Sequence, residues 1–372
     1  MKQRFTALSL LAGLLVVASM AGTVFAQDSD SMPAVPRYAR LLPKLSNEAR
    51  TPATPLTTWN GSFSYLGKTF KYNMVGTTPS TGTSTTVPVF IIPITLKFVK
   101  NGVTTTFSPL HKLNNGLTVV ANTNNSPIFK TMDFVSPGGT DLGTTQYEDA
   151  FQRGNFWGQV ASAPGYHVLL GKPTVLPNQA LTVPAADGAV LTEFGIKVGT
   201  ADINWFDGQL QTIMAKFPQI QPNTLPIFIT YDSYLTSGGC CIGGYHSSSG
   251  SISAPQAYSH FTYIDHVGIF AQDVSALSHE VGEWMDDPLV VNTNGNPVSS
   301  KCGFGAILEV GDPEEGYANY GAFPYTLGGF TYNLQDLTYL EYFGAPNTTS
   351  VDGGALTFHD NPFGMGICTN GG

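Results

Sequence analysis

Positive charge is scarce in this chain of 372 residues. Lysine and arginine together number 17, against 26 aspartates and glutamates, so the formal net charge is −9 at pH 7. A surface with this balance repels the phosphates of nucleic acids and of anionic lipids. We therefore expect no nucleic-acid partner, and no membrane partner once the export signal described below has been removed.

Charged residues of both signs are also few. They make up 12% of the chain, whereas glycine (41 residues) and proline (25 residues) are plentiful. This composition is typical of a protein rich in loops and strands and disfavours a helical bundle. The length suffices for one large domain or two ordinary ones with a substantial core.

Apolar runs long enough to span a bilayer are missing outside the first residues of the chain. There, Lys2 and Arg4 precede an apolar run from Leu8 to Ala18, and Val24-Phe25-Ala26 offers a cleavage site. The run has no charged stop-transfer flank, so a retained membrane anchor is disfavoured. We expect a secreted protein, located outside the cell or in the periplasm.

The domain organisation follows from this and from composition. A signal peptide is predicted at 1–26 and a flexible extension, rich in proline, serine and threonine, at 27–58. A single α+β domain is predicted at 59–372, with a candidate sub-boundary near 185–200. Whether the extension is a propeptide stays open, as does the oligomeric state.

Cysteine is limited to four residues: Cys240, Cys241, Cys302 and Cys368. In an exported chain, four cysteines favour two disulfides. A bond between the adjacent Cys240 and Cys241 is expected to be strained, which favours bridges from this pair to Cys302 and Cys368. The pairing within that set stays open.

Hydrophobic periodicity predicts a mixed β-sheet packed with a few helices, followed by a loop-rich C-terminal part. The expected strands are 62–76, 85–99 with a return after Asn101-Gly102, 225–235 and 261–270, and the expected helices are 144–157, 200–218 and about 273–286. A loop rich in glycine and cysteine is expected between the strand at 225–235 and the one at 261–270.

The last of these helices carries the sequence SHEVGEWMDDP, residues 278–288. It begins like the zinc-protease motif H-E-x-x-H, but Glu283 stands in the place of the second histidine. On a helix, His279 and Glu283 lie about 40° apart on one face, close enough to bind one ion. Glu280 beside them could deprotonate a metal-bound water.

A third metal ligand is expected in LEVGDPEEG, residues 308–316, where Glu309 is the first candidate and Asp312 and Glu315 are rivals. The alternative is that H-E-x-x-E arises by chance and that the acidic residues serve solubility. A second glutamate ligand would also make the bound water less acidic than the usual ligand set does.

Two histidines near the motif are weaker candidates. His246 and His266 could act as an alternative ligand or stabilise an oxyanion, or they could be loop histidines bonded to the backbone. Cys240 or Cys241 with His246 could imitate a thiol nucleophile and base, but disulfide bonding is the favoured interpretation of these cysteines.

Three blocks together resemble a known family. LSHEVGEWMDDPL, EVGDPEEG and the upstream IFITYDSYLTSGGCCIGGYHSSSG resemble, in order and spacing, motifs of the exordium or phosphate-induced protein family and its bacterial secreted relatives. The resemblance covers about residues 225–316. This chain departs from the family in having Pro313-Glu314-Glu315 where a cysteine often follows the second block.

The resemblance implies a zincin-like fold. By the same similarity, the metal ligands would be His279, Glu283 and Glu309, and the general base would be Glu280. We predict a zinc-dependent peptidase that acts on an extended peptide or protein, with a strand near the helix, 225–235 or 261–270, lining the cleft.

Two other functions stay open. One is a non-catalytic extracellular binding or signalling module that holds a structural ion, calcium for example, or none. The other is a carbohydrate-active protein with paired carboxylates, although no aromatic platform accompanies the acidic block.

Overall fold

The computed structural model describes residues 41, 43–46, 54–65, 68–193, 195–290, 308–314, 318–340 and 357–360. The predicted signal peptide, the first part of the predicted extension, Cys302, Cys368 and Glu315 lie outside these ranges.

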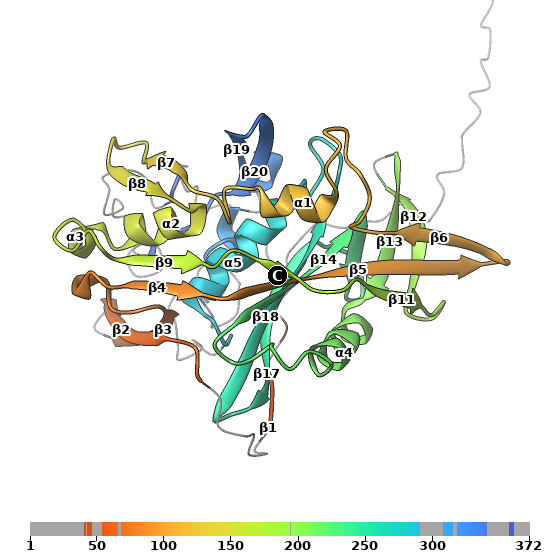
Figure 1. Cartoon of the computed structure of the whole chain (residues 1–372), viewed down its shortest axis with the longest axis horizontal. Helices are drawn as coiled ribbons and strands as arrows, with labels where there is room; N and C mark the ends of the chain where they lie inside the picture. The colour runs from red at the N-terminus through yellow and green to blue at the C-terminus, as the bar shows by residue number, and fades with distance from the viewer. Residues whose placement is uncertain are drawn as a thin grey trace, which may run out of the picture. The chain divides into compact units, whose positions relative to one another are not determined.

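The fold is mixed α+β, with many strands and few helices (Figure 1). The strand order of the largest sheet is β1-β17-β18-β14-β5-β10, and β6 and β11 pair with further parts of β5. Strands β5, β14 and β18 run parallel, and β17 is antiparallel to β18. The strands of this sheet are β1 (Lys44–Ser46), β5 (Val89–Lys100), β6 (Val103–Phe107), β10 (Thr174–Val175), β11 (Gln179–Val183), β14 (Leu225–Tyr231), β17 (Gly244–Ser251) and β18 (Ala254–Tyr263).

The strand predicted at 85–99 is confirmed from Val89 onward as β5, the long strand of this sheet, whereas its first residues belong to a separate strand, β4 (Ser84–Val87). Strand β5 is followed by a tight turn in which Asn101 and Gly102 both have positive φ, 51° and 77°. Asn-Gly favours this conformation, and the turn returns the chain as β6. The predicted hairpin thus forms where the sequence indicates it.

A second sheet has the order β12-β13-β15-β16, and four further strand pairs lie outside both sheets. The four strands of the second sheet are β12 (Gly188–Glu193), β13 (Ile196–Asp202), β15 (Ser233–Thr236) and β16 (Cys240–Ile242). The pairs are β2 (Thr58–Tyr65) with β3 (Lys68–Val75), β4 (Ser84–Val87) with β9 (His167–Leu170), β7 (Met132–Val135) with β8 (Asp141–Thr145), and β19 (Ala322–Leu327) with β20 (Phe330–Gln335).

The three predicted helices form close to their expected bounds. The first is α2 (Tyr147–Asn155), which α3 (Trp157–Val160) continues after a break; the others are α4 (Ile203–Met214) and α5 (Ser275–Asp286). One further helix, α1 (Val119–Asn124), was not predicted. Short 3₁₀ turns lie at η1 (Pro79–Thr81), η2 (Asp312–Glu314) and η3 (Ala318–Gly321). Asp202 caps α4 by accepting hydrogen bonds from the backbone of Asn204 and Trp205.

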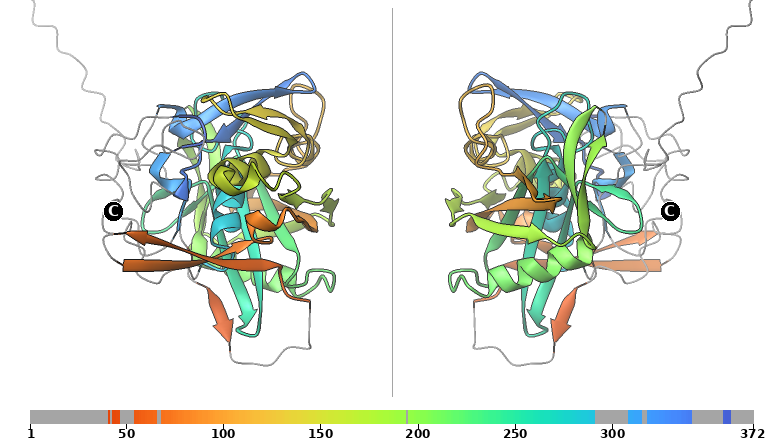
Figure 2. Two further views of the ribbon diagram at one scale, coloured as in Figure 1. Left: turned by 90° about the vertical axis from the view of Figure 1, so that its left-hand side faces the viewer. Right: turned by 90° about the vertical axis from the view of Figure 1, so that its right-hand side faces the viewer.

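The largest sheet lies between α4, drawn in green, and α5, drawn in cyan (Figure 2). Successive side chains of β17 point to opposite faces, because a strand has a period of two residues. Tyr245 faces α4, where its hydroxyl donates to Asp207 at 3.2 Å. His246 faces α5, where it meets Glu280 at 3.3 Å. The strand therefore contributes to the apolar core on one side and to a polar cluster on the other.

Helix α5 is buried on all sides, and each of its twelve residues is buried. It contacts β17, β18, β3, β20 and α2. Trp284, Val281 and Leu277 have no exposed surface, which is expected of the apolar side of this helix, but its polar side is buried as well. Among the described residues, the structure has no helix long and apolar enough to cross a membrane.

Two expectations about the segment before α5 are wrong. The strand predicted at 261–270 instead begins at Ala254 and ends at Tyr263, and the region expected to be a glycine-rich loop forms β16 and β17. Serine and glycine suggested a loop, but here small side chains let α5 approach the sheet: a Cβ added at Gly244 would lie 2.7 Å from a carboxylate oxygen of Glu280. Beyond Tyr263, positive φ angles at Gly268 and Ala271 end the extended conformation.

The expected cysteine pairing is also wrong. Cys240 and Cys241 are bonded to each other, with a cis peptide between them and their Cα atoms 3.1 Å apart. Most disulfides join Cα atoms about 4.4–6.8 Å apart, which is why a bond between adjacent cysteines was not expected. The pair forms the first two residues of β16, and neither cysteine is bonded to Cys302 or Cys368.

Candidate metal centre

Strand β17 and helix α5 bring one histidine and two glutamates together. The Nδ1 atom of His246 lies 3.3 Å from Oε2 of Glu280 and 3.6 Å from Oε2 of Glu283. The Nε2 atom of His246 is 3.3 Å from the carbonyl oxygen of Asp287, just beyond the end of the helix. This backbone contact fixes the ring so that Nδ1 faces the two carboxylates.

The other oxygen of Glu283 faces a second histidine. Nε2 of His279 lies 3.1 Å from Oε1 of Glu283, one helical turn away, and 3.5 Å from Oδ1 of Asp312. The backbone N–H of Gly311 donates to the same Oε1 at 3.1 Å. The segment at 308–314 is therefore held against α5 by its backbone as well as by its side chains.

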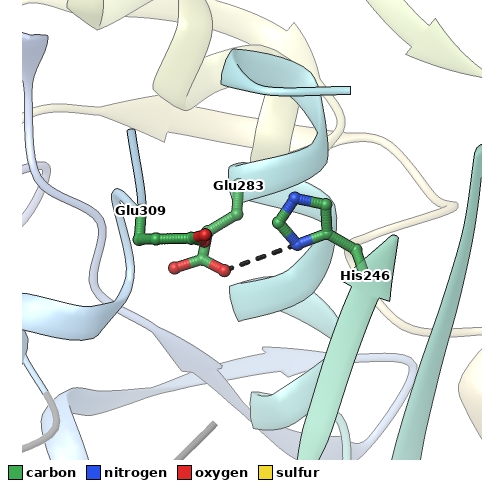
Figure 3. A group of neighbouring side chains, drawn as sticks. All are labelled: His246, Glu283 and Glu309. Carbon is green, nitrogen blue, oxygen red and sulfur yellow. Dashed lines mark ion pairs between the residues drawn. The ribbon is translucent and has the colours of Figure 1, made fainter. Parts of the chain in front are cut away.

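Two groups of three residues have the spacing of metal ligands. In each group one ligand atom from every residue lies within 4.8 Å of the others; the groups are His246, Glu283 and Glu309, and His279, Glu283 and Asp312. Figure 3 shows the first group, in which Glu309 lies against the Glu283 carboxylate opposite His246. Imidazole and carboxylate are ligands that suit zinc and related divalent ions.

Within the described part of the chain, one buried oxygen atom of the cluster has no hydrogen-bond partner, which also favours a bound cation. Oε1 of Glu309 is buried and has no hydrogen-bond partner among the described residues. A buried carboxylate oxygen without a partner costs free energy that a bound cation would offset.

The residues of the cluster are largely buried, but the exposed fraction differs from one to the next. His246, His279, Glu280 and Glu283 are 0–3% exposed, Glu309 is 7% exposed, and the Asp312 side chain is 17% exposed. The cluster therefore meets solvent on the side of Asp312.

Burial shifts the protonation equilibria of the cluster. It raises the pKa of Glu283, to which the charges of Asp312 and Glu280 add, and the pKa of Glu309, to which Glu283 and Asp312 add. Burial lowers the pKa of His246 to about 3, so this imidazole is neutral at pH 7 and able to bind a metal.

The predicted site residues are thus brought together, but in a different grouping. His279 and Glu283 are neighbours, as expected. Glu309 reaches Glu283 on the side of His246, and Asp312, named as a rival ligand, takes the place beside His279. Glu280 lies next to His246, and His266 belongs to neither group among the described residues.

His246 lies in a segment whose glycines and serines predict a loop, and a loop histidine is a weak candidate for a metal ligand. The signal that could have found it is the spacing of Gly244, His246 and Ser248 at alternate positions. These residues share the strand face toward α5, where Ser248 donates to the carbonyl oxygen of Leu289 at 3.0 Å.

A further buried carboxyl group was not indicated by the sequence. Glu148 on α2 is 1% exposed, and neither of its oxygens has a hydrogen-bond partner among the described residues. Burial, then the charge of Asp286, raises its pKa. Glu148 lies against Gly282 of α5, where an added Cβ would be 3.3 Å from its Oε2, but it belongs to neither ligand group.

Gly311 offers a test of the close packing at the centre. A Cβ at this position would lie 2.3 Å from Nδ1 of His279, so Gly311→Ala must displace either the ring or the 308–314 segment. We expect the variant to bind metal at least about tenfold more weakly, as loss of a supporting contact typically causes. Isothermal titration calorimetry with the metal measures the affinity.

Gly208→Ala on α4 is the matched control, because no atom lies within 4 Å of the added Cβ. This control should bind metal like the wild type and should be slightly more stable, since alanine favours a helix over glycine. Equal metal affinity in the two variants would contradict the close contact at His279.

Comparisons with known proteins add no assignment: no family model, no curated protein and no solved structure matches this chain.

Proposed function

We propose that the protein is a secreted, zincin-like metallohydrolase, and specifically a zinc-dependent peptidase. The observation that carries the proposal is the Glu283 carboxylate, which lies between the imidazoles of His246 and His279 with Glu280 beside it. Histidine and carboxylate donors within ligand distance of each other, next to a further carboxylate that could accept a proton, are the parts that hydrolysis by a metal-bound water requires.

The residues divide into ligands and a base. Glu283, with His279 and Asp312 on one side or with His246 and Glu309 on the other, would hold zinc, which supplies a polarised water when bound. Glu280, whose Oε2 lies 3.3 Å from His246 at the edge of the cluster, would take the proton of that water. Glu280 follows His279 directly on the helix but belongs to neither ligand group, which is consistent with a role as the base.

The proposed substrate class, an extended peptide or protein, rests on the family resemblance. The two strands expected to line the cleft are interior strands: β14 lies between β18 and β5, and β18 lies between β17 and β14. Neither has a free backbone edge with which to pair a peptide. A substrate would have to approach the centre from the side of Asp312, where the cluster meets solvent.

Secretion is proposed from the charged and apolar pattern of the first residues. The Cys240–Cys241 disulfide agrees with it, because disulfides persist mainly in oxidising compartments.

The depth of burial favours one alternative, a non-catalytic extracellular module that holds a structural ion. His279 has no exposed surface and Glu283 is 2% exposed. A structural site is closed on all sides, whereas a catalytic site keeps an open position for water. Calcium would suit the carboxylates, but two histidines among the donors argue for a softer ion.

Metal analysis and a hydrolysis assay on the purified, secreted protein test the proposal. We expect bound zinc, cleavage of an unfolded protein such as reduced casein, loss of that cleavage after treatment with 1,10-phenanthroline, and its return with added zinc. Calcium without cleavage would support the structural module. Cleavage that is insensitive to the chelator would refute metal-dependent hydrolysis.

A further inference from the structure

The two histidines of the centre contact different oxygens of one carboxylate. His279 meets Oε1 of Glu283 at 3.1 Å, and His246 meets Oε2 at 3.6 Å. They come from different elements, α5 and β17, so the Glu283 carboxylate lies between the helix histidine and the strand histidine. This is the arrangement of a carboxylate that bridges two ions, with one oxygen directed to each.

Each side of Glu283 has its own set of donors. His246 is grouped with Glu309, and His279 is grouped with Asp312, while Glu283 is the member that the two groups share. No group among the described residues contains both histidines. Two ligands of a single zinc ion lie at most about 4.2 Å apart, twice the usual metal–nitrogen distance. One ion therefore does not account for all five residues.

The charge of the cluster points the same way. Glu283, Glu309 and Asp312 each have a carboxylate oxygen within 4.8 Å of an imidazole nitrogen. Among the described residues, no lysine or arginine forms an ion pair with any of these three. When all three are ionised, one divalent cation would leave one negative charge uncompensated, whereas two would neutralise all three.

We propose that the centre binds two divalent transition-metal ions, bridged by the carboxylate of Glu283. His279 and Asp312 complete one site, and His246 and Glu309 complete the other. The inference deepens the metal-dependent function proposed above and rests on it. In hydrolases with paired metals about 3.5–4 Å apart, the two ions stabilise the attacking and the leaving oxygen of the reaction.

Manganese is a suitable probe, because two Mn²⁺ ions that share a carboxylate couple magnetically and a single bound ion does not. The metal-free full-length protein is titrated with Mn²⁺, and bound metal is counted after removal of the excess. We expect two ions per chain and an electron paramagnetic resonance spectrum of a coupled pair. One ion per chain, with the six-line spectrum of an isolated ion, would overturn the proposal without any variant.

Variants then assign the two sites. His246→Ala should bind one ion and lose the magnetic coupling, and His279→Ala should also bind one ion. His266→Ala, a half-buried histidine outside both groups, should bind two. Circular dichroism verifies that each variant is folded; a folded His246→Ala protein that still binds two coupled ions would refute the second site.

Metal stoichiometry and casein cleavage together distinguish a failure of the paired centre from a failure of the proposed hydrolase. A protein that binds one ion and cleaves casein in a chelator-sensitive way retains the proposed function and refutes the paired centre. A protein that binds two ions and cleaves nothing retains the paired centre and refutes the hydrolase.

Discussion

Replacement of Glu280 by glutamine is expected to reduce kcat by about 10²–10⁴-fold, the usual contribution of a general base. Glutamine has the shape of glutamate but cannot accept the proton of the attacking water. Glu280 belongs to neither ligand group, so the variant should keep its metal. Steady-state hydrolysis of a peptide substrate and metal analysis of the same sample measure the two effects.

Glu148→Gln is the matched control. Glu148 is also a fully buried glutamate packed against α5, but it lies outside the ligand groups. Burial raises its pKa and so favours the neutral form, and an amide of the same shape should leave kcat and metal content unchanged. Full activity of Glu280→Gln would remove Glu280 from the mechanism, and loss of metal would make it a ligand.

The second large effect is a loss of stability in acid caused by buried histidine. His260 on β18 has no exposed surface, and burial lowers its pKa from 6.5 to about 3. The folded state therefore keeps His260 neutral while the unfolded chain binds a proton below pH 6.5. The histidine stabilises the fold above pH 6.5, and this contribution is lost as the pH falls from 6.5 toward 3.

His260→Gln should remove this dependence, because glutamine can keep the contact that Nε2 of His260 makes with Thr230 at 3.1 Å but does not titrate. Between pH 7 and pH 4.5, the free energy of unfolding of the wild type should fall by about 2–3 kcal/mol more than that of the variant. Urea denaturation at both pH values measures the difference. The exposed His111→Gln should fall as the wild type does, and an equal fall in all three proteins would refute the assignment to His260.

Much of the fold follows from local patterns. The apolar run of β5, the Asn-Gly turn after it and the apolar stripe of α4 each determine local structure through side chains that are neighbours in the sequence. The motif helix follows in the same way, and so does the proximity of His279 to Glu283, because residues four apart always share a helix face.

The rest of the site depends on contacts between distant segments, which periodicity does not encode. His246 lies next to Glu280 only because a strand of small residues lets α5 approach closely. Asp312 is placed beside His279 because Gly311 has no side chain to hold the two segments apart. In both cases the decisive residue is a glycine, whose sequence signal is the same as that of a loop. For the same reason the glycine-rich segment before His246 was predicted to be a loop.

The short strand β1 has a practical consequence for producing the protein. It pairs in parallel with β17, and Lys44 forms an ion pair with the buried carboxylate of Asp207. A recombinant form that begins at residue 59, the start of the predicted domain, would lack both. It would leave β17 as an unprotected edge, open to pairing with another chain, and Asp207 without its cation. Because β17 also carries His246, such a shortened protein would aggregate through the strand that holds part of the metal centre.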